Sequence, residues 1–91
     1  MSIDPYKARK VKLLTEFTEQ LRKDLPPMIA RKKADWFTGG RVSPKTLANE
    51  DKLGKGPAQR AIIGGEVCYP RDAFVAYLLS KQVEVIDVPV L

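Results

Sequence analysis

Residues 43–78 read SPKTLANEDKLGKGPAQRAIIGGEVCYPRDAFVAYL, and they constrain the architecture of the chain more than any other segment. Their first part predicts a helix from Pro44 to about Lys52, because Ser43 can cap the helix and proline suits the first helical position. The run Gly54-Lys55-Gly56-Pro57 ends this helix, since glycine and proline both interrupt helical structure.

The next residues predict a β-hairpin followed by a helix. Two β-favouring runs, residues 60–63 and 67–69, flank Gly64-Gly65, a pair that allows the positive φ angles of a two-residue turn. Pro70 then opens a closing helix that ends near Lys81, and its apolar face consists of Ala73, Phe74, Tyr77 and Leu78.

Residues 29–42 supply the other half of a helix pair. The spacing of apolar residues predicts a short helix over about residues 29–37, and Thr38-Gly39-Gly40 predicts a turn after it. Two short helices joined by a glycine-containing turn, followed by a hairpin, are the layout of a winged helix-turn-helix. The expected fold is therefore mostly α with a small two-stranded β-hairpin wing, formed by residues 29–82.

An amphipathic N-terminal helix is expected before this unit. Asp4-Pro5 is a suitable helix start, and an apolar stripe recurs at steps of three and four over residues 5–24: Val11, Leu14, Phe17, Leu21 and Leu25. Leu25-Pro26-Pro27 ends this helix, so residues 1–28 form a helix with a proline linker. The stripe packs either on the domain or on a second copy. The basic residues of the first turns meet either DNA phosphate or solvent: Lys7, Arg9, Lys10 and Lys12.

Composition excludes several classes of function. The chain has 91 residues, which suffice for one domain with a small core. With one cysteine and no histidine, it lacks a disulfide framework, a zinc-ligand cluster and a histidine base, so we expect no enzyme, no metal and no cofactor. No apolar run reaches the length of a membrane span and no signal peptide is recognisable, which predicts a cytoplasmic protein without membrane contact.

The charge distribution favours an acidic partner. The whole chain has a formal net charge of +5. Residues 29–60 carry eight Lys or Arg against three Asp or Glu, a local net charge of +5, whereas residues 61–91 carry a net −2 and residues 1–28 a net +2. Positive charge is thus concentrated where the helix-turn-helix is expected, as in proteins that bind nucleic acid.

With these motifs identified, residues 29–80 resemble winged helix-turn-helix proteins of the excisionase/AlpA type, relatives of the MerR DNA-binding domain. The matching motifs are Ser43-Pro44-Lys45-Thr46-Leu47, Gly54-Lys55-Gly56-Pro57, Ile63-Gly64-Gly65-Glu66-Val67-Cys68-Tyr69 and the helix of residues 70–78. The resemblance implies a small factor of a phage or mobile element, either an excisionase that directs an integrase or a transcriptional regulator. It does not choose between them and does not identify the DNA sequence that is bound.

The helix that begins at Pro44 is expected to contact DNA bases. Lys45, Thr46 and Asn49 share one face, which Lys52 continues, and these side-chain types can reach base edges in the major groove. The alternative is an ordinary solvated polar face. The flanking groups are expected to contact the DNA backbone or the minor groove: Arg31, Lys32, Lys33, Arg41, Ser43, Lys55 and Arg60.

Other side chains are expected in the core. Leu47 should anchor its helix, Cys68 should be a small buried hydrophobe, and the aromatic side chains should fill the rest: Trp36, Phe37, Tyr69, Phe74 and Tyr77. Glu50 and Asp51 can face phosphate, base edges, or the core and the neighbouring basic residues Lys55 and Arg60. The last of these three orientations is favoured, because the first would repel DNA.

The expected function is sequence-specific binding of double-stranded DNA by an excisionase or small regulator. The alternative is a protein-interaction factor that docks on an integrase or regulator, because a DNA-binding module requires neither the amphipathic first helix nor the apolar tail VEVIDVPVL, residues 83–91. Self-association on DNA is also expected through the apolar stripe and this tail. The alternating pattern of the tail is suited to adding a strand to a neighbour, with Pro89 limiting it to a sheet edge.

Overall fold

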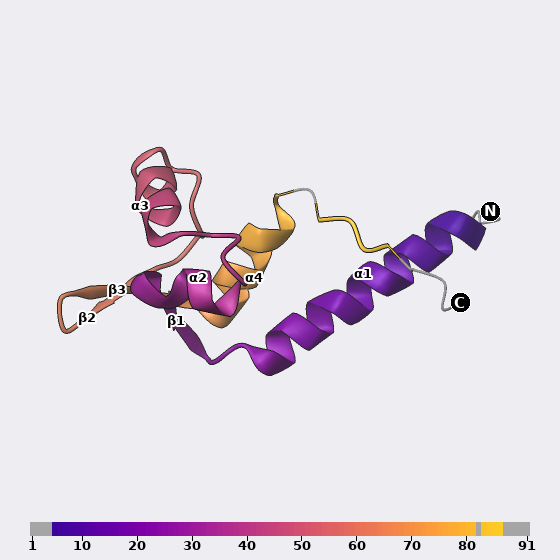
Figure 1. Cartoon of the computed structure of the whole chain (residues 1–91), viewed down its shortest axis with the longest axis horizontal. Helices are drawn as coiled ribbons and strands as arrows, with labels where there is room; N and C mark the ends of the chain where they lie inside the picture. The colour runs from indigo at the N-terminus through magenta and orange to yellow at the C-terminus, as the bar shows by residue number, and fades with distance from the viewer. Residues whose placement is uncertain (1–4, 82, 87–91) are drawn as a thin grey trace.

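The computed structural model describes residues 5–81 and 83–86, which form four α-helices, a short 3₁₀ helix and one three-stranded antiparallel sheet (Figure 1). The elements before the turn of residues 38–43 are α1 (Pro5–Asp24), β1 (Met28–Ala30), the 3₁₀ helix η1 (Arg31–Lys33) and α2 (Ala34–Phe37). The elements after it are α3 (Pro44–Lys52), β2 (Ala61–Ile63), β3 (Glu66–Pro70) and α4 (Arg71–Leu79). No helix within the described ranges has both the length and the apolar character needed to cross a membrane.

Local sequence signals explain the bounds of α3 and of the hairpin. The Ser43 side chain accepts a hydrogen bond of 3.0 Å from the backbone N–H of Thr46, which caps α3 as predicted. After α3, Gly54 adopts a φ of 71° and the chain turns away. Gly64 and Gly65 have φ angles of 59° and 81°, so the turn between β2 and β3 is of the kind in which both central residues need positive φ. The predicted bounds of α1, α3 and the hairpin are confirmed.

The sheet contains one strand more than the sequence predicts. The strand order is β1-β3-β2, with Ile29 opposite Tyr69 and Ile62 opposite Val67. The helix expected from residue 29 onward is wrong in its first half, because Ile29 pairs with β3 and is fully buried there. Only residues 34–37 form α-helix, and residues 31–33 form a 3₁₀ turn between strand and helix.

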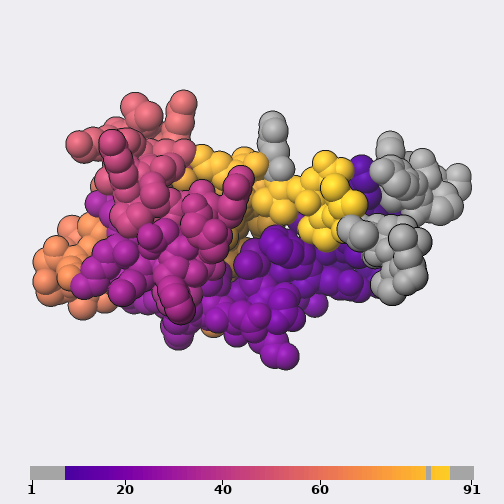
Figure 2. Space-filling view, viewed as in Figure 1, coloured from indigo at the N-terminus to yellow at the C-terminus, as the bar shows by residue number. Residues whose placement is uncertain are grey.

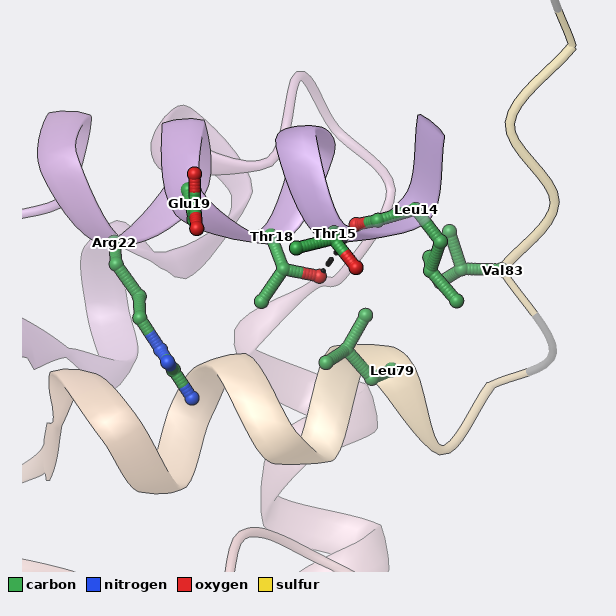
Figure 3. A pocket seen from close by; sticks show the side chains of 7 residues that line it. All are labelled: Leu14, Thr15, Thr18, Glu19, Arg22, Leu79 and Val83. Atoms are coloured by element: carbon green, nitrogen blue, oxygen red, sulfur yellow. Dashed lines mark hydrogen bonds between the residues drawn. The ribbon is translucent and has the colours of Figure 1, made fainter. Parts of the chain in front are cut away.

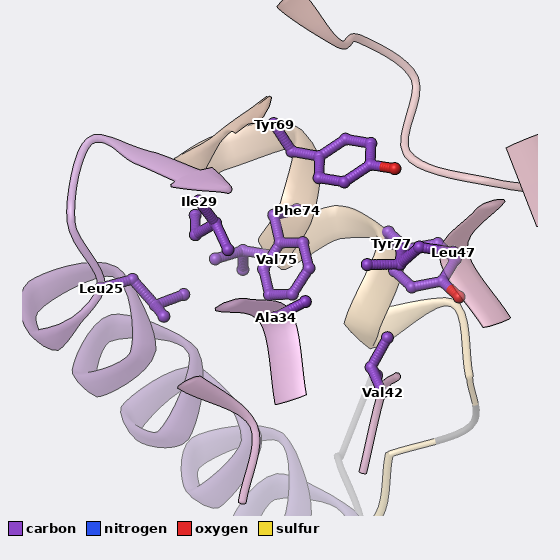
Figure 4. Packing of buried hydrophobic residues seen from close by; sticks show 9 residues of the cluster. All are labelled: Leu25, Ile29, Ala34, Val42, Leu47, Tyr69, Phe74, Val75 and Tyr77. Atoms are coloured by element: carbon purple, nitrogen blue, oxygen red, sulfur yellow. The ribbon is translucent and has the colours of Figure 1, made fainter. Parts of the chain in front are cut away.

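One core holds α1, the sheet and the remaining helices together (Figure 4). Its buried members are Leu25, Ile29, Ala34, Val42, Leu47, Tyr69, Phe74, Val75 and Tyr77. The core positions predicted for Leu47 and for the three aromatics of β3 and α4 are confirmed, while Cys68 is half-buried. The prediction for Trp36 and Phe37 is wrong, since 79% of Trp36 and 37% of Phe37 are exposed. Ala34 occupies the inward position of α2, and a helix of four residues has only one such face.

The long axis of the molecule, 50 Å against 32 and 20 Å, follows α1. Figure 1 shows α3 and the β2–β3 hairpin at one end of this axis and the first turns of α1 at the other. Within the predicted stripe, Leu25 belongs to the core and Leu21 packs against it, whereas Val11 is 65% and Phe17 40% exposed. The basic first turns of α1 therefore lie far from α3.

Residues 83–86 lie beside α1 and form neither helix nor strand within the single chain; the addition of a strand to a neighbour stays a prediction, and residues 87–91 lie outside the described residues. Val83 lies opposite Leu14, with Leu79 of α4 on the third side of a small cleft (Figure 3). Glu84 also pairs with Lys10 of α1 at 3.7 Å. The described part of the tail thus covers α1 of its own chain.

Candidate nucleic-acid interface

The outward face of α3 is polar and carries positive charge. Lys45, Thr46, Asn49 and Lys52 are all exposed, whereas Leu47 on the opposite side is fully buried. Figure 2 shows the α3 region projecting from its end of the molecule, where neither α1 nor the tail covers it. The four side chains that the sequence places on one face therefore share one accessible surface.

The inward side of α3 is fixed by a buried carboxylate. Only 5% of the Asp51 side chain is exposed, and its Oδ2 accepts hydrogen bonds of 2.6 Å from Arg31 Nη2 and 2.6 Å from the Tyr69 hydroxyl. Arg31 Nε also donates to the Tyr69 oxygen at 2.9 Å, which closes a triangle of three side chains. These bonds join α3 to η1 and to β3, so the cluster sets the position of α3 relative to the hairpin.

Burial and hydrogen bonding alter the acidity of the two partners of Asp51. The hydrogen bond with Tyr69 is the main cause that raises the pKa of the Arg31 guanidinium, and Asp51 adds to it. Desolvation is the main cause that raises the pKa of the Tyr69 phenol, and its bond to the Asp51 carboxylate acts in the same direction. Arg31 therefore stays charged and Tyr69 stays protonated, as the two hydrogen bonds to Asp51 require.

The second oxygen of Asp51 is enclosed by the loop that follows α3. Oδ1 lies 3.7 Å from Arg60 Nη1, and among the described residues this buried atom has no hydrogen-bond partner. The loop passes directly over it at Gly56, where an added Cβ would lie 1.9 Å from Oδ1. Glycine is therefore the residue that fits at position 56.

A second carboxylate ties α3 to α4. Glu50 accepts hydrogen bonds from the Tyr77 hydroxyl and from Lys81 Nζ, and only 19% of its side chain is exposed. The bond with Lys81, followed by the bond with Tyr77, lowers the pKa of Glu50. Burial, reinforced by the adjacent Glu50, raises the pKa of Tyr77. Glu50 is thus held in its ionised form, and both acidic residues of α3 are directed away from Lys45 and Asn49.

The favoured orientation of Glu50 and Asp51 is confirmed, with different partners in one case. Asp51 faces the interior and lies near Arg60, as expected. Glu50 binds Tyr77 and Lys81, while Lys55 contributes only its charge from a greater distance. Neither carboxylate faces the surface on which Lys45 lies.

The residues that flank this face divide into two groups. Arg31 is three-quarters buried and is directed to Asp51, and Lys32 pairs with Glu66 of the hairpin at 2.7 Å. Ser43 serves as the cap of α3, and Arg60 is half-exposed beside Asp51. The remaining three are exposed, and no carboxylate of the described residues forms an ion pair with them: Lys33, Arg41 and Lys55. Since residues 31–33 form a 3₁₀ turn, they do not open an α-helix as the sequence suggested.

A shallow cleft connects the start of α3 to the hairpin. It has a volume of about 320 Å³ and is lined by Arg31, Lys32, Pro44, Gly65, Glu66 and Val67. The cleft brings the hairpin turn and the first turn of α3 to a common surface. Its two basic lining residues, Arg31 and Lys32, belong to η1 and are paired with Asp51 and Glu66, so the cleft itself adds no unpaired cation to the face of α3.

The sequence did not single out Tyr69, Tyr77 and Gly56 as supports of α3. A tyrosine in a core usually binds a partner through its hydroxyl, so two buried tyrosines signal two polar partners somewhere in the fold. Which partners they find depends on contacts across 18 and 27 residues of sequence. Within the described ranges, no group of three or more Cys, Asp or Glu is placed to hold a metal ion.

Comparisons of the chain with protein-family models, with curated proteins and with solved structures found no match.

Proposed function

We propose that this chain is a winged helix-turn-helix protein that binds double-stranded DNA in a sequence-specific way, with α3 as the recognition helix and the β2–β3 hairpin as the wing. One observation carries the proposal. The outward face of α3 presents Lys45, Asn49 and Lys52, while both carboxylates of the helix are turned inward and paired with basic residues or tyrosines.

This division of α3 matters because DNA is a polyanion. A carboxylate beside a phosphate would be repelled, and pairing Asp51 with Arg31 and Glu50 with Lys81 removes that repulsion from the exposed face. The exposed cations around α3 then remain free to approach phosphates: Lys33, Arg41, Lys45, Lys52 and Lys55. Asn49, near the middle of that face, is suited to a bidentate bond with adenine.

Selection from a random duplex library, followed by binding measurements, tests this function. A selected sequence should emerge, and the logarithm of the binding constant should fall linearly with the logarithm of salt concentration, with a slope near −0.9 per phosphate contacted. Asn49→Ala should reduce discrimination at one base position by about 1–3 kcal/mol. Lys45→Ala should reduce affinity, and Lys12→Ala, on the distant first turns of α1, serves as the control. Failure of the selection to enrich any sequence would refute the proposal.

As a biological role we propose an excisionase or a small transcriptional regulator of a phage or mobile element, in line with the motif resemblance of residues 29–80. A footprint separates the two roles: protection beside a recombination site favours excision, and protection over a promoter favours regulation.

Docking on an integrase or regulator is the second candidate function. The exposed side chains of Phe17 and Phe37, which line one groove, favour it, because contiguous exposed apolar surface marks protein-interaction sites. Binding of that kind would respond little to salt, unlike DNA binding.

A further inference from the structure

Trp36 is the most exposed large apolar side chain of the described residues, at 79%. It lies at the end of α2 and contributes nothing to the core, where Ala34 supplies the contact. Tryptophan buries more area than almost any other side chain when it is covered, and it is enriched among the residues that dominate binding energy at protein interfaces. Trp36 is therefore a suitable anchor for a protein partner.

An apolar groove borders α2 at Phe37, the residue that follows Trp36. Its volume is about 480 Å³, and Phe37 forms part of one wall. The α1 side contributes Phe17 and Leu21, and the α4 side contributes Tyr77 and Leu78. The volume of the groove lies within the range of small-molecule pockets and is large enough for an indole ring.

The charges beside Trp36 and beside the groove are opposite in sign. Asp35 precedes Trp36 and is exposed, and Arg41 lies on the rim of the groove and is exposed as well. Neither forms an ion pair with another described residue. A partner that inserts a tryptophan into this groove and carries a carboxylate beside it would fill the groove and neutralise Arg41. This chain itself has such a pair of residues, Asp35 and Trp36.

We propose that the occupant is a second copy of the chain: Trp36 of each copy inserts into the groove of the other, and Asp35 of each copy pairs with Arg41 across the interface. Trp36 and the groove residue Phe37 are adjacent in α2, so one patch can supply both the inserting residue and the groove, as a closed two-fold dimer requires. Two tryptophans contribute roughly 300–500 Å² of buried surface. Since stable interfaces bury about 1,200 Å² or more, the dimer is weak and concentration-dependent.

Intrinsic fluorescence tests the proposal, because Trp36 is the single tryptophan of the chain. The full-length protein is diluted through the micromolar range without DNA, and emission is recorded alongside sedimentation velocity. The emission maximum should move to longer wavelength as the dimer dissociates, and the two curves should coincide. Trp36→Ala should raise the dissociation constant roughly thirty-fold or more, the effect typical of a central anchor residue. Ile62→Ala, at a side chain of similar exposure on the hairpin, is the matched control and should leave the constant unchanged.

A charge exchange identifies the second copy as the occupant. Asp35→Arg and Arg41→Asp should each weaken the dimer, and the double variant should restore it, because every copy of the double variant carries both exchanged charges and the pair across the interface forms again. Circular dichroism verifies that each variant is folded. The proposal is overturned if the protein sediments as a monomer throughout, if Trp36→Ala leaves a dimer equally strong, or if the monomer already shows the short-wavelength emission of a buried indole.

Discussion

Replacing Asp51 by asparagine tests whether the buried carboxylate holds α3 in place. Asparagine keeps the volume of the side chain and one acceptor oxygen but removes the charge. Arg31, with 25% of its side chain exposed, then remains partly buried without its counter-ion. Removing one partner of a buried ion pair typically costs about 3–5 kcal/mol, because the other charge stays uncompensated. We expect about 3 kcal/mol for Asp51→Asn, since the oxygen of asparagine still accepts one hydrogen bond.

The molecule contains a natural control for this substitution. Lys32 and Glu66 form an ion pair of 2.7 Å, almost the same length as the 2.6 Å pair of Arg31 and Asp51, but both partners are more than half exposed. Exposed pairs contribute about 0–1 kcal/mol, so Glu66→Gln should change stability little. The two substitutions are chemically equivalent and differ mainly in burial.

The free energy of unfolding of both variants is measured at neutral pH by urea denaturation, followed by far-ultraviolet circular dichroism. For a domain of this size, a loss of about 3 kcal/mol corresponds to a melting temperature lower by roughly 12–24 °C. If Asp51→Asn costs no more than Glu66→Gln, the buried cluster does not stabilise the fold, and the argument for a fixed recognition helix fails with it.

Three further predictions concern the same supports. Gly56→Ala should destabilise the fold by about 1–3 kcal/mol in thermal melts, because its Cβ would lie 1.9 Å from the Asp51 carboxylate. Glu50 has a pKa below its ordinary 4.5, so its contribution is complete above pH 4.5 and is lost as the pH falls through the lowered pKa; acid unfolding curves of Glu50→Gln should lack that component. Tyr69 and Tyr77 have raised pKa values, so their contribution is complete below pH 10 and declines as the pH rises further, and absorbance titration should show both phenols ionising only with unfolding.

Local signals in the sequence predicted the elements whose geometry is decided within a few residues. Ser43-Pro44 defined the start of α3, and Gly64-Gly65 defined the hairpin turn, because a cap and a positive-φ turn each depend on adjacent side chains. Burial of Leu47 followed from helical spacing alone. For α3 and the hairpin, pattern and structure agree.

Contacts between distant residues account for what the sequence did not predict. The strand at Met28–Ala30 exists because β3 supplies its hydrogen-bond partners, about forty residues later, and a run of three residues gives no periodicity of its own. Arg31 was grouped with the phosphate-binding candidates because it belongs to a basic run, yet its guanidinium pairs with Asp51 twenty residues away. Adjacent aromatics on a short helix usually fill a small core, which predicts a buried Trp36, yet the buried position of the four-residue α2 is taken by Ala34.

The two sides of α3 also govern how readily the protein can change. Leu47, Glu50 and Asp51 hold the helix, and Lys45 and Asn49 point outward without taking part in the core or its ion pairs. Substitutions at exposed positions of this kind usually alter stability by less than about 0.5 kcal/mol. Under the proposed function, a descendant of this chain can therefore acquire a new target sequence through single substitutions on the outer face, while the inherited scaffold stays intact.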